Sequence, residues 1–354
     1  MTTKQVTSLA LAAIVLGGLA FLSSNNKKMK TPLLVGKPLI KNLDLTSVQK
    51  LEVTENGKPK FTLALTENGW VIPSLFNYPA DITKIRANLL RLQELKIGHV
   101  ATGKKLTNPA LVDFQNAAGK SLATVRLGEP HMREAKGQMA MYGGGAYPDG
   151  RYVATESEQV FLVGDPLNMF DDGVRTWTET QIASVPAADV VTVEFKNNGE
   201  TLKMDRKDGK WLLAGLSDKE EIDTSKTYNL DSGLSYLNFS SVADPKRSSA
   251  DLGLTTGAVY TIHLKNGESY MAKLGNAVGS DRYCQLTAAF TATGTNATEN
   301  ATSTAKVKTF NENIGTWTYV IPASSADTMI KRRADVVKAK EEKKDDTKPN
   351  EPKN

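Results

Sequence analysis

A pattern of apolar residues around an Asn-Gly pair occurs twice in this chain, at a constant offset of 142 residues. The apolar positions of 48–53 precede Asn56-Gly57, and those of 190–195 precede Asn198-Gly199. Alternating apolar residues on both sides of Asn-Gly predict a β-hairpin, because this dipeptide tolerates the positive φ angles of a tight turn. The chain is therefore expected to contain one folding module twice.

Each copy continues in the same order. A tryptophan, Trp70 or Trp211, opens a third short strand, and an aspartate, Asp81 or Asp223, then stands where it can cap a helix. Leucine and isoleucine at helical spacing come next, which predicts one apolar face packed on the sheet. The residues of this face are Ile82, Ile85, Leu89 and Leu92 in the first copy and Leu230, Leu234 and Leu237 in the second.

Both copies are then expected to return to strands. Runs at 111–114 and 122–127 correspond to runs at 259–264 and 270–274, and each second run ends before a glycine, Gly128 or Gly275. The next strands start at Arg151-Tyr152 and Arg282-Tyr283, and Thr176-Trp177-Thr178 recurs as Thr316-Trp317-Thr318. The connections between most strands are too short for helices, so the sheets should be antiparallel.

The predicted fold class is α+β: two tandem copies of a mostly antiparallel sheet with one main helix each, plus an N-terminal hydrophobic helix. A short helix that includes Met329, Ile330, Ala334 and Val337 is expected beyond Ser324. The Thr-rich stretch 291–304 is interpreted as a low-complexity insertion. Four segments are expected: an N-terminal membrane anchor or signal segment over 1–30, a first α+β repeat over 31–185, a second over 186–337, and a disordered charged tail over 338–354.

The N-terminal segment directs the chain to a membrane. Residues 6–22 are apolar apart from Thr7 and Ser8, and 17 residues span about 25 Å as a helix. A cleaved signal peptide is the alternative, with Gly18-Leu19-Ala20 as its small-residue site. The lysines after the run favour a cytoplasmic location for the C-terminal side of this segment, by the positive-inside rule.

The net charge of +5 lies at the ends of the chain. Residues 1–30 hold four lysines and no acids, and residues 331–354 hold nine basic and six acidic residues. The remaining 31 basic and 33 acidic residues nearly balance, so a basic face for nucleic acid is not expected.

The residue patterns predict no catalytic, cofactor-binding or metal-binding site. His99, His131 and His263 are the only histidines and are far apart in the sequence, and Cys284, the only cysteine, is expected to be buried. The glycine run 143–145 does not match the sequence of a phosphate-binding loop. It is expected to be a flexible loop, which could contact a partner because glycine allows close approach of the backbone.

Three aspartates, Asp165, Asp171 and Asp172, do not have the spacing of a calcium loop. They are expected at the start and on the solvent side of a helix that begins at Asp165-Pro166. Asn296 and Asn300 start formal glycosylation sequons, which matter only in a eukaryotic host.

Over residues 48–337 the chain resembles the bacterial family called domain of unknown function 4340. The resemblance rests on the N-terminal hydrophobic segment, Gly69-Trp70, Pro79-Ala80-Asp81 with its leucine-rich helix, Thr176-Trp177, and the stretch from Trp317 to Pro322. The chain departs from it at Glu221-Ile222-Asp223, which stands in the second copy where the first has Pro-Ala-Asp, and in the Thr-rich insertion. Members of this family are commonly encoded beside ABC-2 type transporters of the gliding-motility type.

The resemblance implies a non-enzymatic, membrane-tethered accessory or scaffold protein of the bacterial envelope. Its expected partner is an ABC-2 type permease or ATPase, or another envelope protein, and its expected location is the inner membrane, single-pass, with the soluble part in the periplasm. The alternative is a periplasmic module that binds a glycan, lipid or peptide between the two repeats.

Overall fold

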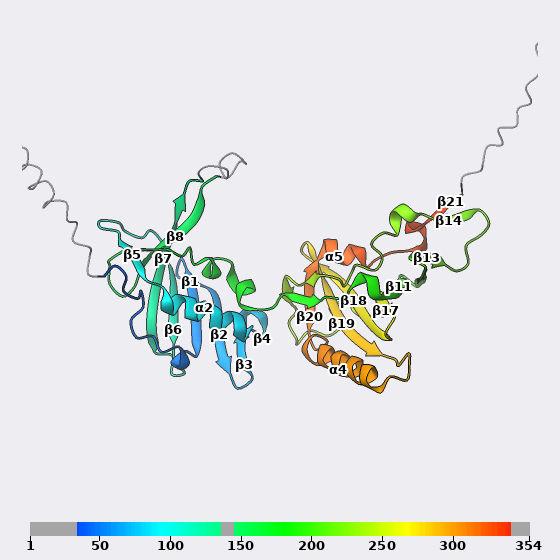
Figure 1. Ribbon diagram of the computed structural model, residues 1–354, viewed down its shortest axis with the longest axis horizontal. Helices are drawn as coiled ribbons and strands as arrows, with labels where there is room; N and C mark the ends of the chain where they lie inside the picture. Colours follow the sequence, from blue (N-terminus) through cyan, green and yellow to red (C-terminus); the bar gives the residue numbers. More distant parts are fainter. Residues whose placement is uncertain (1–33, 136–144, 341–354) are drawn as a thin grey trace, which may run out of the picture. The chain divides into compact units, whose positions relative to one another are not determined.

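The computed structural model describes residues 34–135 and 145–340, and the chain divides into two compact units (Figure 1). Unit 1 comprises residues 1–62 and 83–173, and unit 2 comprises residues 63–82 and 174–354. The N-terminal hydrophobic helix expected over residues 1–30 lies outside the described residues.

The first large sheet has nine strands in the order β4-β3-β2-β1-β6-β7-β8-β9-β5. Its strands are β1 (Lys50–Glu55), β2 (Lys58–Thr66), β3 (Gly69–Ile72), β4 (Tyr78–Pro79), β5 (Ile97–Val100), β6 (Ala110–Gln115), β7 (Ser121–Arg133), β8 (Tyr147–Ala154) and β9 (Phe161–Val163). Helix α2 (Ile82–Glu94) comes after β4, and the short 3₁₀ turns are η1 (Leu45–Ser47), η2 (Pro73–Leu75), η3 (Asn168–Phe170) and η4 (Gly173–Trp177).

The second large sheet has eight strands in the order β13-β12-β11-β17-β18-β19-β20-β16. Its strands are β11 (Val190–Asn197), β12 (Glu200–Lys207), β13 (Lys210–Leu213), β16 (Ser241–Val242), β17 (Ala258–Leu264), β18 (Glu268–Val278), β19 (Asp281–Phe290) and β20 (Thr318–Pro322). Two small ladders pair β10 (Gln181–Ala183) with β15 (Leu237–Asn238) and β14 (Glu220–Ile222) with β21 (Val337–Ala339).

The helices of the second copy are α4 (Ala297–Asn313) and the short α5 (Ala323–Thr328). The helix expected after Ser324 is wrong in its extent, because α5 ends before Met329, Ala334 lies in a 3₁₀ turn and Val337 begins β21. Three 3₁₀ turns complete the assignment: η5 (Ala187–Asp189), η6 (Thr224–Lys226) and η7 (Arg333–Asp335). Strand β21 continues through Ala339, so the first residues of the expected charged tail are paired with β14, and residues 341–354 lie outside the described part.

The strand orders of the two sheets confirm the tandem repeat. Reading from β3 and from β13, both sheets place a first hairpin, then three further antiparallel strands, then a short strand, and end on a strand that comes earlier in the sequence. The pairings described are antiparallel in both sheets, and residues 34–135 and 145–340 contain three α-helices. The α+β class predicted from the sequence is confirmed.

The Asn-Gly turns form as predicted. Asn56 and Gly57 have φ angles of 52° and 72°, and Asn198 and Gly199 have φ angles of 50° and 79°. Two consecutive residues with positive φ make the tight turn whose twist matches that of the flanking strands. The Asn-Gly pair therefore sets the register of each hairpin.

One predicted helix is wrong. Leu230 and Leu234 of the apolar stripe after Asp223 lie in turns beyond η6, and Leu237 begins β15, although all three leucines are buried. Between these leucines stand Asp231, Ser232, Gly233 and Ser235, which disfavour a helix because short polar side chains compete for backbone hydrogen bonds and glycine loses entropy. Buried contacts in the core of unit 2 hold the leucines without a helix.

The main helix of the second copy is instead α4, which begins inside the Thr-rich stretch expected to be a low-complexity insertion. Asn296 caps it by accepting hydrogen bonds from the backbone N–H groups of Thr298 and Glu299. Asn311 in its last turn both donates to and accepts from the backbone of Ala288 on β19, at 2.8 Å each. Helix α4 therefore lies along β19 (Figure 1).

A β-bulge recurs at the same place in both copies. Gly128-Glu129 stand opposite the single residue Tyr152, and Gly275-Asn276 stand opposite Tyr283. In each case the arginine that resumes the pairing donates a hydrogen bond to the glycine carbonyl. These bonds are Arg151 Nε to Gly128 O at 2.8 Å and Arg282 Nη1 to Gly275 O at 2.7 Å.

Close packing requires glycine at the bulge. A Cβ atom at Gly275 would lie 2.1 Å from the backbone oxygen of Leu252, and one at Gly128 would lie 2.5 Å from the side chain of Leu106. Leu106 belongs to the segment before β6 and Leu252 to the segment before β17, the strands that pair with β1 and β11. We call the segment that contains Leu106 or Leu252 the crossing segment. The bulge, its arginine and the crossing segment thus form a structural unit that occurs in both copies.

We expect Gly275→Ala to destabilise unit 2 by about 2 to 3 kcal/mol, because overpacking against backbone cannot be relieved by a side-chain rotation. Urea unfolding followed by the fluorescence of the tryptophans measures the change. Gly294→Ala is the matched control in the same unit, since its Cβ would meet no atom within 4 Å. Equal effects of the two substitutions would contradict the packing argument.

Candidate functional site

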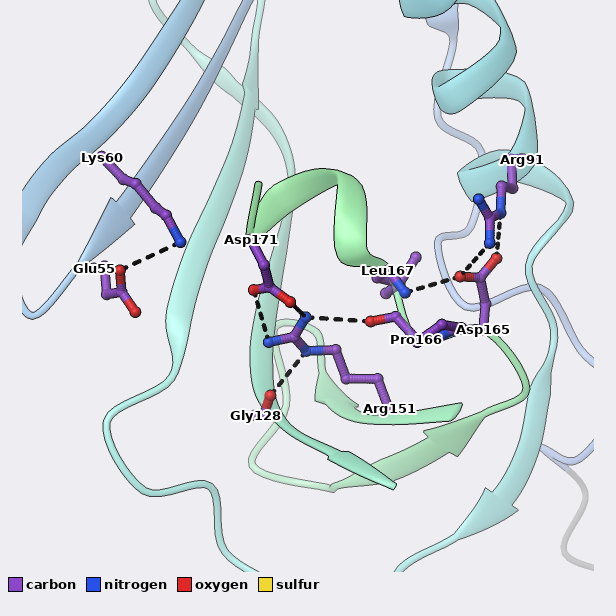
Figure 2. A network of polar contacts seen from close by, with 9 residues as sticks. All are labelled: Glu55, Lys60, Arg91, Gly128, Arg151, Asp165, Pro166, Leu167 and Asp171. Carbon is purple, nitrogen blue, oxygen red and sulfur yellow. Dashed lines mark hydrogen bonds and ion pairs between the residues drawn. The ribbon is translucent and has the colours of Figure 1, made fainter. Parts of the chain in front are cut away.

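A polar network in the first copy surrounds the buried side chain of Arg151 (Figure 2). Arg151 is 6% exposed, and besides Gly128 its guanidinium contacts Asp171 through two bonds, Nη1 to Oδ2 at 2.5 Å and Nη2 to Oδ1 at 3.1 Å. Nη1 also donates to the carbonyl of Pro166 at 3.2 Å. A bidentate carboxylate and two carbonyls satisfy the buried charge, as a buried arginine requires.

Asp165 extends the network toward α2. Its carboxylate accepts hydrogen bonds from Arg91 on that helix, one of them from Nη2 at 2.8 Å, and from the backbone N–H of Leu167 at 2.8 Å. The segment after β9 is thereby fixed to both the sheet and the helix. The expectation that a helix begins at Asp165-Pro166 is wrong, because only the 3₁₀ turns η3 and η4 form in this segment. Asp171 and Asp172 are exposed, as expected, although Asp171 also pairs with Arg151.

The second copy keeps the arginine and lacks its carboxylate. Arg151 pairs with Val163 across β8 and β9, and Arg282 pairs with Ile321 across β19 and β20. Eight residues after the paired position, the first copy has Asp171 and the second has Met329, which is fully buried in the core of unit 2. The network in Figure 2 is therefore a structural addition to one copy.

A second buried carboxylate, Glu268, lies where α4 meets β18. It is 2% exposed and accepts hydrogen bonds from Lys306 Nζ at 2.7 Å, Tyr270 OH at 2.8 Å and Ser303 Oγ at 3.0 Å. Burial opposes ionisation, but these three donors outweigh it and hold the pKa of Glu268 below its ordinary value. A polar cavity of about 550 Å³ opens beside it, lined by Lys265, Asn296, Glu299 and Lys306 among others.

A smaller cavity of about 320 Å³ in unit 2 combines aromatic walls with carboxylates, and we call it the Tyr78–Trp317 cavity. The rings of Tyr78 and Trp317 meet edge to face with centroids 4.9 Å apart. Asp81, Glu179 and Glu312 also line it, together with Ile314. Tyr78 is itself part of the core of unit 2, where it contacts Phe239 with ring centroids 5.1 Å apart.

Backbone hydrogen bonds fix the walls of this cavity. The N–H of Asp81 donates to the carbonyl of Trp177 at 2.8 Å, and Thr178 Oγ1 donates to the carbonyl of Pro79 at 2.8 Å. Burial raises the pKa of Tyr78, and the negative charge of Glu179 adds a smaller effect in the same direction.

The sequence did not indicate this cavity. Its lining comes from segments 78–81, 178–179 and 312–317. Residues 79–81, Thr178 and Trp317 stood out in the sequence only as features of the repeat. The two Thr-Trp-Thr triplets are not equivalent in the fold: Trp177 is fully buried after β9, whereas Trp317 directly precedes β20 and lines the cavity. The α4 helix, inserted between β19 and β20, displaces the second triplet.

The histidines remain apart, on β5, β7 and β17. His131 Nδ1 contacts Asp149 Oδ1 at 2.6 Å, and this contact is the largest cause of the lowered pKa of Asp149. Cys284 is fully buried, as predicted, and burial raises the pKa of its thiol to about 12. Of the glycine run 143–145, only Gly145 falls among the described residues.

Within residues 34–135 and 145–340, no cluster of three or more histidine, cysteine, aspartate or glutamate residues could hold a metal ion. In the same residues, no helix has the combined length and hydropathy needed to cross a membrane. Asn296 and Asn300 of the sequons lie at the start of α4, and the oxygen of Asn296 is engaged in capping it.

Comparison with known proteins identifies the family. The model of the family described as Domain of unknown function (DUF4340) matches residues 70–257, slightly more than half of the chain, and the chain belongs to this family. No curated protein matches the chain significantly. No solved structure matches it significantly either.

The two bulge arginines provide a matched pair of substitutions. We expect Arg151→Met to destabilise unit 1 by about 2 to 3 kcal/mol, because it leaves the half-exposed Asp171 and two carbonyls without their donor. Arg282→Met removes one described hydrogen bond and should cost unit 2 about 1 kcal/mol or less. Urea unfolding of both variants measures the costs, and a larger cost for Arg282→Met would contradict this assignment.

The charge of Glu268 should make unit 2 acid-sensitive. Because its folded pKa lies below the ordinary value of 4.5, its contribution is complete above that value and is lost as the pH falls through the folded pKa. Glu268→Gln should therefore destabilise unit 2 by about 2 kcal/mol at pH 7, and the difference from the unsubstituted chain should shrink below about pH 4.5. Urea unfolding at a series of pH values measures this, and a constant difference would refute it.

Proposed function

We propose that this member of the DUF4340 family is a non-enzymatic accessory protein of the bacterial envelope that docks a membrane transporter of the ABC-2 type. Its N-terminal hydrophobic segment would tether it to the inner membrane, with both repeats in the periplasm. The family resemblance motivates the choice of partner. The proposed location rests on that resemblance and on the apolar run at 6–22.

The observation that carries a docking role is a pair of exposed tyrosines in unit 2. Tyr228 and Tyr236 are 80% and 75% exposed, far more than the other large apolar side chains of the described residues. Tyrosine is enriched at protein interfaces, because its rigid ring offers a large contact area and its hydroxyl offers a hydrogen bond. Two such rings on one short segment are suited to protein contact.

The segment that bears the tyrosines is fixed from beneath. Leu230 and Leu234 are buried between them, and Tyr260 OH donates to the carbonyl of Leu230 at 2.7 Å. Asp231 is buried and paired with Arg206, which in turn lies 4.5 Å from the ring of Trp211. Because the backbone of this segment is already held in place, the segment would lose little backbone entropy on binding.

A ligand-binding role is the second candidate, and the Tyr78–Trp317 cavity favours it. Aromatic walls with a few charged groups are typical of sites that hold small ligands, and its volume lies at the lower end of their usual range of about 300–1,000 Å³. The two roles are compatible, since the cavity can serve a partner's side chain.

We expect Tyr228→Ala with Tyr236→Ala to abolish co-purification of transporter subunits from mildly solubilised membranes. The substitutions should change the stability of unit 2 by less than about 1 kcal/mol, because both side chains are exposed. Affinity capture of the tagged full-length chain, followed by mass spectrometry, measures the association. Circular dichroism on heating measures the stability.

Tyr147→Ala is the matched control, because Tyr147 is a partly exposed tyrosine at the start of β8 in unit 1. It should leave the captured subunits unchanged. Recovery of the unsubstituted chain without any transporter subunit would overturn the proposed partner. Equal losses in the control and in the double variant would overturn the assignment of the surface.

A further inference from the structure

We infer that the outer edge of β13 binds an extended segment of another protein, which adds to the second sheet as an antiparallel strand and carries an acidic side chain beside Lys210. The inference deepens the proposed docking role by naming the chemistry of a partner segment, and it rests on that role only for its biological meaning. Its test uses synthetic peptides and does not require the transporter.

The first copy shows how the corresponding edge is occupied. Strand β4 lies along β3 as an antiparallel strand (Figure 1). The carbonyl of Trp70 accepts a hydrogen bond from the N–H of Ala80 at 2.8 Å. The carbonyl of Ile72 accepts one from the N–H of Asn77 at 3.1 Å. A short extended segment therefore covers the third strand of this copy.

In the second copy the corresponding segment pairs elsewhere. Strand β14 has the place of β4 in the repeat, because Glu221-Ile222-Asp223 corresponds to Pro79-Ala80-Asp81. It nevertheless pairs with β21, and the N–H of Asp223 donates to the carbonyl of Val336 at 2.9 Å. Six residues connect β13 to β14 and five connect β3 to β4, so the connection is long enough for the pairing seen in the first copy. Strand β14 is engaged by β21 and does not cover β13.

The edge of β13 is therefore open. Trp211 and Leu213 follow their two-residue hairpin turn at the same positions as Trp70 and Ile72 follow theirs. Within the described parts of the chain, no group donates to the carbonyls of Trp211 and Leu213. Their N–H groups face the same edge, because both backbone groups of a residue in an antiparallel ladder point to one side. Such an edge is a template for an added strand.

The side chains beside this edge favour an acidic segment. Lys210 lies directly opposite Lys207 of β12, and both lysines are exposed. Like charges directly opposite each other destabilise a ladder. Among residues 34–135 and 145–340 neither lysine has an ion-pair partner, and Asp208 in the turn between them pairs with neither. A carboxylate on an added strand beside Lys210 would relieve this repulsion.

The other face of β13 favours apolar residues in the added strand. Trp211 is 9% exposed and packs with the core of unit 2, and Leu213 is partly buried against the same core. Successive side chains of a strand point to opposite faces, so the matching segment alternates acidic and apolar residues. A second copy of the chain does not fit, because pairing two β13 strands would bring the lysines of both copies to one edge.

The test uses the full-length chain in detergent and three acetylated hexapeptides. The first alternates valine and glutamate, and the second alternates valine and lysine. The third is the first with N-methylated valines, which keeps the charge and lacks the N–H donors that would face β13. The glutamate peptide should bind with a Kd of about 1 mM and, at saturation, slow hydrogen exchange in 210–213 by at least about threefold. Exchange in 69–72, which β4 covers, should not change.

Charge reversal tests the selection of an acidic segment. Lys207→Glu with Lys210→Glu should invert the preference, so that the lysine peptide binds about three- to fivefold more tightly than the glutamate peptide. Lys37→Glu with Lys41→Glu is the matched control, because it changes the net charge equally at two exposed lysines of unit 1. It should leave the preference unchanged. Thermal unfolding verifies that both double variants are folded.

Four results would overturn the inference. Slow exchange at Trp211 and Leu213 in the free chain would mean that the chain covers its own edge. Protection that grows with protein concentration alone would assign the edge to a second copy. Equal binding of the N-methylated peptide would show general charge attraction, and the absence of saturable binding would exclude the site. Peptide binding at 210–213 without any co-purified transporter subunit would support this site and overturn the proposed partner.

Discussion

The hydrogen bond from an arginine to the carbonyl of a bulged glycine organises both copies of this fold. A bulge leaves a backbone group outside the ladder, and an unpaired buried carbonyl is costly. Arg151 and Arg282 supply the missing donor, and the missing Cβ of Gly128 and Gly275 lets the crossing segment approach. The opposing tyrosine then meets a cation from that segment: Lys104 lies 3.9 Å from the ring of Tyr152, and Arg247 donates to the hydroxyl of Tyr283 at 2.8 Å.

The repeat, the hairpins and the fold class could be predicted because they depend on local rules. Asn-Gly fixes a turn and alternation fixes a sheet face, whatever the rest of the chain does. The helix after Asp223 could not be predicted from its leucine stripe, since buried leucines are compatible with turns once Tyr260 OH binds the carbonyl of Leu230. Helix α4 was missed for the opposite reason: its threonines gave no apolar stripe, and contacts such as Ser303 with Glu268 hold it in place.

Sites that combine residues from distant segments could not be predicted from the sequence, because only the folded core brings those residues together. Tyr78, Glu179, Glu312 and Trp317 become neighbours only through the core of unit 2, and no spacing rule relates them. The aspartates that follow β9 show that a distant residue can also change the role of a single side chain. Asp171 and Asp172 are exposed, as their positions suggested, but Asp171 also binds the buried guanidinium of Arg151, on a strand 20 residues earlier. The second copy makes this difference visible, because it has the corresponding arginine, Arg282, but has Met329 at the position counted from β20 where the first copy has Asp171.

The two hydrogen bonds between Asn311 and Ala288 have a consequence for the open side of the second sheet. Strand β20 pairs with residues 281–285 of β19, so the rest of β19 meets the end of α4 instead of a strand. The side-chain amide of Asn311 imitates a peptide group: it offers one donor and one acceptor at the positions that a neighbouring strand would use. A sheet margin closed in this way cannot recruit a strand from another molecule there, which protects the chain from edge-to-edge aggregation in a crowded compartment.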